Sequence, residues 1–320
     1  MADYKPTTAE IKKLRDKTLA GFQDCQKALV EAGGNMEGAE DIIRKKGLLV
    51  AAKKAHREAS DGLVVARVAE DCSEGALVEI NCETDFVAKT PQFQGLAATL
   101  ADHAIKMAPE GICPGSDLHD QELHPACGKT VRLVVEEVIG QIGENMCFSR
   151  AVRFKVPQPG VVQAYIHPPG KIGVLVEIGC TNEADKENCK GLAHELALQI
   201  AFADPSFIAP EDIPADVLDK ERNLAMEKAR EQGKPEHMVP KIAEGMLRKY
   251  YQEECLLDQP YAKDPKISVR DFVKQSGIAN VEVRRFARFS LKCTFAPLLF
   301  IAQSTPDRSG VFVSPTPCVS

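Results

Sequence analysis

The sequence predicts an α+β protein of 320 residues with a duplicated core. Three observations predict this class: a helical pattern in the first fifty residues, two copies of a strand, turn, strand, loop and helix pattern, and a long charged helical segment within the second copy. We expect a three-helix module (1–54), a first core subdomain (55–150), a second core subdomain (151–290) and a tail (291–320). The tail is apolar, contains prolines and shows no clear periodicity.

The first 54 residues are expected to form three short helices. Thr7 and Glu10 make a capping box for the first of them. The third is expected to begin after Asn35 and to end at Gly47, and a cationic helical connector, LLVAAKKAHREAS, follows it. The second helix is expected to carry Phe22, Cys25, Ala28 and Leu29 on one side.

An internal repeat dominates the middle of the chain. GLVVARVAEDCSEGALVEINCETD, from Gly62, aligns without a gap with GVVQAYIHPPGKIGVLVEIGCTNE, from Gly160, at an offset of 98. GLAATLADHAI, from Gly95, resembles GLAHELALQIA, from Gly191, in the segment that follows. We therefore expect two similar α+β subdomains that bury their sheets by packing against each other.

The second copy is interrupted from about residue 211 to residue 266 by a charged, helical insertion. The turn at 233–235, Gly-Lys-Pro, predicts a hairpin of two helices there. KISVRDFVKQ and VEVRRFARF then predict a further helix and a strand.

The two copies differ where their second strand ends. The first copy has Phe86 and Val87, and the second has Ala184 and Asp185 opposite them. An aromatic at this place either caps its own strand from the core or is presented to another molecule. The strand before it is shared by both copies whereas the aromatic is not, and this contrast favours presentation.

Composition and charge exclude several classes of function. The formal charge of -6 argues against binding to a nucleic-acid backbone, which needs a basic face. No apolar run approaches the roughly 18 residues that cross a bilayer, and the start of the chain lacks the features of a targeting segment. The eleven cysteines are scattered singly, as in a reducing cytoplasm, where we expect the protein to be located.

The motifs of enzymes and metal sites are incomplete. The segment 128–130, Gly-Lys-Thr, resembles the end of a P-loop, but Leu123 replaces the glycine that the phosphate nest requires. His194 is expected on a helix surface or partly buried rather than as a catalytic base. One loop carries zinc-ligand residue types without the tight spacing of a zinc knuckle, and a polar surface loop is favoured there. These four residues are Cys113, His119, His124 and Cys127. We expect no enzyme activity, metal or cofactor.

Five segments, in this order, closely resemble the translation elongation factor Ts family. They are TLAGFQDCQKAL (18–29), EINCETDFVAK (79–89), IGEN (142–145), LALQIAFADPSFI (196–208) and CLLDQPYAKDP (255–265). The resemblance spans about residues 5–289. It implies that the N-terminal module is ubiquitin-associated-like, and that the chain is a nucleotide exchange factor for elongation factor Tu.

The resemblance also implies which residues act. A segment that dislodges Mg2+ from elongation factor Tu falls on Thr84, Asp85, Phe86 and Val87. Contacts with the partner fall on Arg15, Phe22, Asp24 and Lys27 in the N-terminal module, and on Leu198, Gln199, Ile200, Phe207 and Ile208 in the second core subdomain. Three positions depart from the family pattern: Leu19 replaces a usual glycine, Gln23 a common methionine, and Gln199 a frequent histidine.

The function that follows is exchange without covalent chemistry. The chain is expected to bind elongation factor Tu with GDP, to dislodge Mg2+, and to promote GDP release so that GTP can bind. The alternative is a docking or scaffold protein on elongation factor Tu without exchange activity. A homodimer through the helical insertion is a further expectation; neither nucleic acid nor a membrane is expected as a partner.

Overall fold

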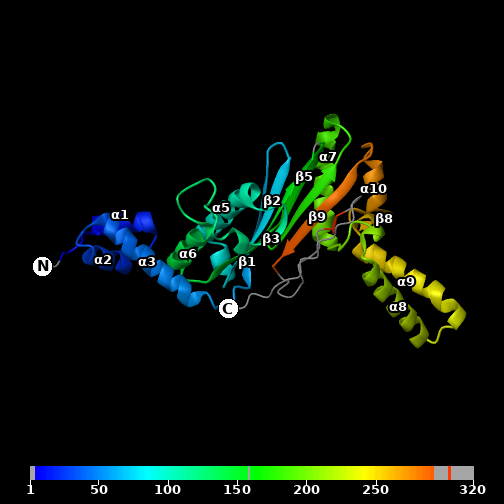
Figure 1. The fold of residues 1–320 in the computed structure, drawn as a ribbon, viewed down its shortest axis with the longest axis horizontal. Helices are drawn as coiled ribbons and strands as arrows, with labels where there is room; N and C mark the ends of the chain where they lie inside the picture. Colours follow the sequence, from blue (N-terminus) through cyan, green and yellow to red (C-terminus); the bar gives the residue numbers. More distant parts are fainter. Residues whose placement is uncertain (1–3, 158, 292–301, 304–320) are drawn as a thin grey trace.

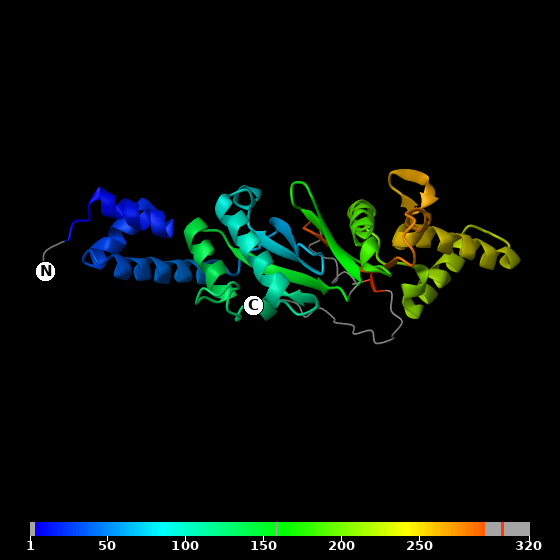
Figure 2. The same ribbon diagram turned by 90° about the horizontal axis from the view of Figure 1, so that it is seen from above.

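The computed structural model describes residues 4–157, 159–291 and 302–303. Its described part is an elongated α+β molecule, with three N-terminal helices at one end, a helical hairpin at the other and two β-sheets between them (Figures 1 and 2). The predicted α+β class is therefore confirmed. No helix in these residues is long and apolar enough to span a membrane. Apart from residues 291, 302 and 303, the predicted tail lies outside the described residues.

The N-terminal helices are α1 (Thr8–Thr18), α2 (Phe22–Glu31) and α3 (Met36–Lys54). The capping box is present, because the Thr7 hydroxyl accepts a hydrogen bond from the Glu10 N–H (3.3 Å) and the Glu10 carboxylate accepts one from the Thr7 N–H (2.7 Å). The small core between the helices consists of Ile11, Leu14, Cys25, Ala28, Leu29 and Ala39.

Phe22, the first residue of α2, lies beyond the small core and is 47% exposed, unlike Cys25, Ala28 and Leu29 of the same helix. One detail of this module was predicted wrongly. Helix α3 does not end at Gly47 but continues to Lys54 as one helix of 19 residues. The reason is packing: a Cβ on Gly140 of α6 (Val131–Ile142) would lie 2.5 Å from the Gly47 Cα, so these glycines allow two helices to cross almost in backbone contact.

The first sheet has the strand order β1-β2-β4-β3. The helices α5 (Pro91–Met107) and α6 bury its outer face. The predicted boundary at residue 150 falls inside β4, all of which belongs to this sheet. The strands are β1 (Asp61–Val68), β2 (Glu74–Cys82), β3 (Gly111–Pro114) and β4 (Met146–Lys155), and a short 3-10 helix, η1 (Gly115–Leu118), follows β3.

The second sheet has the order β10-β9-β6-β5, and α7 (Lys186–Ala203) and α10 (Val269–Gln275) bury its outer face. Its strands are β5 (Gly160–His167), β6 (Ile172–Gly179), β9 (Glu282–Ser290) and β10 (Ala302–Gln303). Outside it lie a ribbon of β7 (Pro260–Tyr261) and β8 (Asp264–Ser268), and the 3-10 helices η2 (Glu183–Asp185), η3 (Pro210–Asp212), η4 (Glu236–Met238) and η5 (Leu256–Asp258).

The internal repeat appears in the structure as two related hairpins. β1 pairs with β2, and β5 pairs with β6, both antiparallel. The register of the next strand shifts at the same place in both copies, between Glu79 and Ile80 in the first and between Glu177 and Ile178 in the second. This shared irregularity supports the duplication, because a bulge is a feature of the fold rather than of a single sequence.

The two sheets pack face to face, as the sequence predicted. Their shared apolar layer includes Leu77 and Phe154 from the first sheet, and Leu175 and Phe289 from the second. An arginine of each copy also covers an aromatic ring of the other: the Arg150 guanidinium lies 4.2 Å from the Phe289 ring centre, and that of Arg285 lies 4.4 Å from the Phe154 ring centre.

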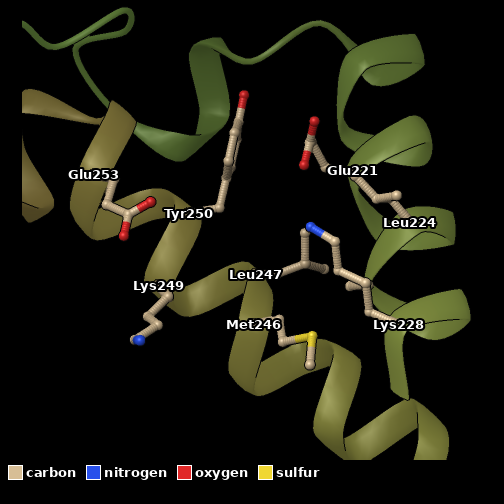
Figure 3. Close-up of a pocket in the computed structure, with 9 residues that line it drawn as sticks. Glu221, Leu224, Lys228, Met246, Leu247, Lys249, Tyr250 and Glu253 are labelled. Atoms are coloured by element: carbon tan, nitrogen blue, oxygen red, sulfur yellow. The ribbon is translucent and has the colours of Figure 1, made fainter. Parts of the chain in front are cut away.

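The charged segment after α7 forms an antiparallel pair of helices, α8 (Ala215–Glu231) and α9 (Val239–Glu254), with the turn at Gly233 where the sequence predicts it. A shallow groove of about 220 Å3 lies between them (Figure 3). Tyr250 and Met246 of α9 line it opposite Glu221 and Lys228 of α8.

A buried histidine makes the first subdomain sensitive to acid. His103 of α5 is fully buried; its Nδ1 accepts the His124 N–H (3.0 Å), so its Nε2 carries the proton and donates to the Gln121 Oε1 (3.1 Å). Burial lowers the pKa of His103, and burial together with the charge of Arg132 lowers that of His119. Near pH 6.5 these two histidines therefore bind protons in the unfolded chain but stay neutral in the folded chain.

We expect the melting temperature to fall as the pH drops from 7 to 5.5, with up to about 1.4 kcal/mol lost per pH unit for each such histidine. His103→Gln should lower the stability at pH 7 but reduce this pH dependence. His194→Gln, at an exposed position of α7, is the matched control and should leave the slope unchanged. An equal slope in all three proteins would contradict the assignment.

Candidate functional site

The segment after β2 folds into a single helical turn, α4 (Asp85–Ala88), that presents one aromatic side chain. The Thr84 hydroxyl caps the turn by accepting the Val87 N–H (3.4 Å). Val87 and Ala88 are buried in the core of the first subdomain, whereas Phe86 is 78% exposed. Of the two readings that the sequence left open, the structure supports presentation: Val87 anchors the turn and Phe86 points to solvent.

The charged neighbours of Phe86 form a pair. Lys89 Nζ lies 2.6 Å from the Asp85 Oδ2 and 5.9 Å from the centre of the Phe86 ring. The hydrogen bond from Lys89 lowers the pKa of Asp85, so the carboxylate is ionised at neutral pH. A partner surface that meets Phe86 therefore also meets an anion and a cation on the same turn.

Two residues of the IGEN segment hold this loop, and sequence reasoning assigned them no role. The Glu144 carboxylate accepts hydrogen bonds from the Thr84 N–H (3.1 Å) and the Thr84 hydroxyl (2.9 Å). The Asn145 N–H donates to the Glu83 carboxylate (2.6 Å), and this bond lowers the pKa of Glu83. The IGEN motif was the signal in the sequence for these two residues, but it indicated only the family resemblance and not their contacts with the loop.

The four predicted contact residues of the N-terminal module lie at or near the surface. Arg15 and Lys27 are exposed, Phe22 is half-exposed, and Asp24 forms an ion pair with Lys46. The exposed Leu19 lies three residues before Phe22 and adopts a φ of +57°, in the region where glycine, the usual residue of the family here, is free of strain.

Most of the second predicted set lies inside the molecule. Ile200, Phe207 and Ile208 are buried, which leaves Leu198 as the member of the set that reaches the surface. Gln199 is 1% exposed; its amide donates to the Gln259 Oε1 (3.1 Å) and accepts the Ala262 N–H (2.8 Å). These four side chains therefore lie beneath the surface of the free chain.

Leu198 lines an open groove of about 580 Å3 between α7, the second sheet and the β7–β8 ribbon. Phe202, which sequence reasoning missed, lines the same groove and is 80% exposed. A comparison of the copies could have found it: in the first copy the aligned positions are Asp102 and Lys106, both charged, whereas the second copy places apolar residues at these surface positions of its helix.

Comparison with known proteins decides the family. The family model described as Elongation factor TS matches residues 83–292, about two thirds of the chain. The chain belongs to the elongation factor Ts family. It is 44% identical to Elongation factor Ts of Aquifex aeolicus over 284 residues, which cover 88% of this chain and 96% of that protein. It is 42% identical to Elongation factor Ts of Streptomyces coelicolor, with 91% and 99% covered.

The other motifs have structural partners in this member of the elongation factor Ts family. Thr130 caps α6, and Lys129 pairs with Glu137 (2.7 Å), so the segment 128–130 has a structural role. Among the described residues, no cluster of three or more His, Cys, Asp or Glu side chains could hold a metal ion. Cys113, His119, His124 and Cys127 are among these described residues. His194 lies on the exposed face of α7, with its ring 6.1 Å from that of Tyr165.

Proposed function

We propose that this chain is a guanine nucleotide exchange factor of translation elongation. It binds elongation factor Tu with GDP, dislodges Mg2+ and promotes GDP release so that GTP can bind. The observation that carries the proposal, beside membership of the elongation factor Ts family, is the exposure of Phe86 on a turn that Val87 anchors from below. An apolar ring of this size stays exposed at the cost of unfavourable hydration, which a partner surface relieves.

The mechanism acts through the metal ion. Mg2+ is the largest local positive charge on the β-phosphate, so moving it weakens the hold on GDP directly. The ring of Phe86 wedges into the nucleotide-binding domain of elongation factor Tu, and Thr84, Asp85 and Val87 place it. The chain acts by binding alone and catalyses no covalent step.

The wedge does not suffice by itself. Burying one phenylalanine contributes roughly 1.5 to 3 kcal/mol, whereas a thousandfold acceleration of release needs about 4 kcal/mol. The remainder comes from docking at both sides of the core. The ubiquitin-associated-like module supplies Arg15, Phe22, Asp24 and Lys27, and the groove beside α7 supplies Leu198, shaped by the buried residues beneath it.

The hairpin of α8 and α9 is the insertion in the second core subdomain. Two chains pair through this hairpin, where Leu224, Met246 and Tyr250 line the groove of Figure 3 together with charged side chains. We place the protein in the cytoplasm, where elongation factor Tu acts, without a direct role for nucleic acid or membrane.

The test is stopped-flow release of a fluorescent GDP from elongation factor Tu, with and without the chain. We expect a large acceleration in the presence of Mg2+. A chelator should raise the rate of elongation factor Tu alone and shrink the acceleration, because the ion is then already removed. Binding without acceleration would instead establish the scaffold alternative.

A further inference from the structure

A carboxylate from a distant part of the chain holds the loop of Phe86. Glu144 follows Gly143, the C-cap of α6, and lies sixty residues after Thr84 in the sequence. Its two oxygens accept both the N–H and the hydroxyl of Thr84, at 2.9 to 3.1 Å. Thr84 is thus fixed on its donor side by Glu144, while its hydroxyl oxygen caps the turn of Phe86.

The residues next to Thr84 and Glu144 are also hydrogen-bonded to each other. Glu83, beside Thr84, accepts the N–H of Asn145, beside Glu144 (2.6 Å). Asn145 is 7% exposed and its side-chain amide donates to the Arg57 carbonyl (2.6 Å), just after α3. The Arg57 guanidinium lies 3.4 Å from the Glu83 carboxylate and closes the ring of contacts. The loop of Phe86, the end of α6 and the end of α3 therefore meet in one network.

This network connects Phe86 to the N-terminal module. Helix α3 belongs to that module and crosses α6 at the close contact of Gly47 and Gly140. The end of α6 then carries Glu144 to the loop. A series of packing contacts and hydrogen bonds thus runs from the N-terminal module, which carries Arg15 and Phe22, to the turn of Phe86.

The second copy supplies a comparison within the same molecule. Its loop after β6 has Asn182 in the place of Thr84 and Thr181 in the place of Glu83. The Asn182 side chain caps its own turn by accepting the Asp185 N–H (3.0 Å), and Thr181 donates to the Ala279 carbonyl (2.8 Å). The carboxylate clamp on a threonine thus belongs to the copy that carries the exposed aromatic.

We infer that Glu144 is a positioning residue for Phe86: its carboxylate clamps Thr84 and sets the direction in which the ring leaves the surface. This inference rests on the proposed function. A helical turn of four residues does not hold its shape alone, because nucleation of a helix is unfavourable. Without the clamp the ring samples several directions, and a smaller fraction of encounters places it in the partner.

The test combines kinetics with a double-mutant cycle. Glu144→Ala should lower the maximal rate of GDP release from elongation factor Tu about tenfold, with the half-saturating concentration within about twofold of wild type. Glu144→Gln keeps an acceptor oxygen and should recover most of the rate. In a Phe86→Ala background, Glu144→Ala should change the rate little, because there is no ring left to position. Glu136→Ala, on α6, is the matched control.

Additive losses in the cycle, or a loss equal to that of the Glu136 control, would overturn the inference. Amide hydrogen exchange of residues 84–90 in the free chain provides a readout that does not depend on exchange activity. Glu144→Ala should speed exchange there while the amides of β2 stay protected. Unchanged exchange in the turn refutes the clamp even if the wild-type chain is active, whereas absent acceleration by wild type refutes the proposed function alone.

Discussion

Phe86→Ala is expected to slow GDP release at saturating concentrations of the chain by about ten- to a hundredfold. The reason is the lost burial of one phenylalanine in the partner, roughly 1.5 to 3 kcal/mol, at about 1.36 kcal/mol per decade of rate. Stopped-flow release of a fluorescent GDP from elongation factor Tu measures it. The residual acceleration that remains reports what the docking surfaces contribute without the wedge.

The substitution should hardly change the stability of the folded chain. Phe86 is 78% exposed, so its removal creates no cavity, and the melting temperature should stay within about one degree of wild type. Val87→Ala in the same turn is the contrast: Val87 is buried, and shortening it should cost about 1 kcal/mol of stability.

Phe202→Ala is the matched control, since it removes the same side chain from another exposed site, in the groove beside α7. It should preserve the maximal rate and affect only the half-saturating concentration. A Phe86→Ala protein as fast as wild type would refute the wedge. Equal losses of maximal rate in both variants would show that exposed aromatics act in docking rather than on the nucleotide.

The exposure of Phe86 could be predicted from the sequence because the two copies of the repeat can be compared with each other. Two copies of one strand share the residues that folding needs, so a residue that only one copy has, Phe86, is free to serve another purpose. The clamp by Glu144 was not predictable in this way. It joins residues sixty apart, and only the meeting of β2 with the end of α6 in three dimensions brings them together.

On α7, by contrast, the sequence did not reveal which of the predicted contact residues are buried. Family resemblance selected a run of residues, but successive residues of a helix point in different directions, so Gln199 and Ile200 turn inward while Leu198 reaches the groove. Local propensity also failed at Gly47, which ends helices in most contexts. Here the close contact with Gly140 on α6 requires a residue without a side chain inside the helix, so tertiary packing outweighs the low helix propensity of glycine.

The core has its own critical contact, at an arginine that joins the two sheets. Arg285 of β9 places its Nε 2.6 Å from the Glu177 carboxylate, which is 2% exposed, and its Nη2 2.5 Å from the Glu110 carboxylate of the first subdomain. The same guanidinium covers Phe154. Removing it leaves a buried carboxylate whose next cation, Arg284, is 3.5 Å away, and uncovers an aromatic ring.

Arg285→Leu is therefore expected to lower the free energy of unfolding by about 3 to 5 kcal/mol, as measured by urea denaturation. Arg222→Leu, which breaks an exposed ion pair with Asp219 on α8, should cost less than about 1 kcal/mol. The double variant Glu177→Met with Arg285→Leu should recover part of the loss, because no carboxylate then stays buried without its close arginine partner. If Arg285→Leu were as mild as Arg222→Leu, neither the buried ion pair with Glu177 nor the contacts of Arg285 with Glu110 and Phe154 of the other copy would be important for stability.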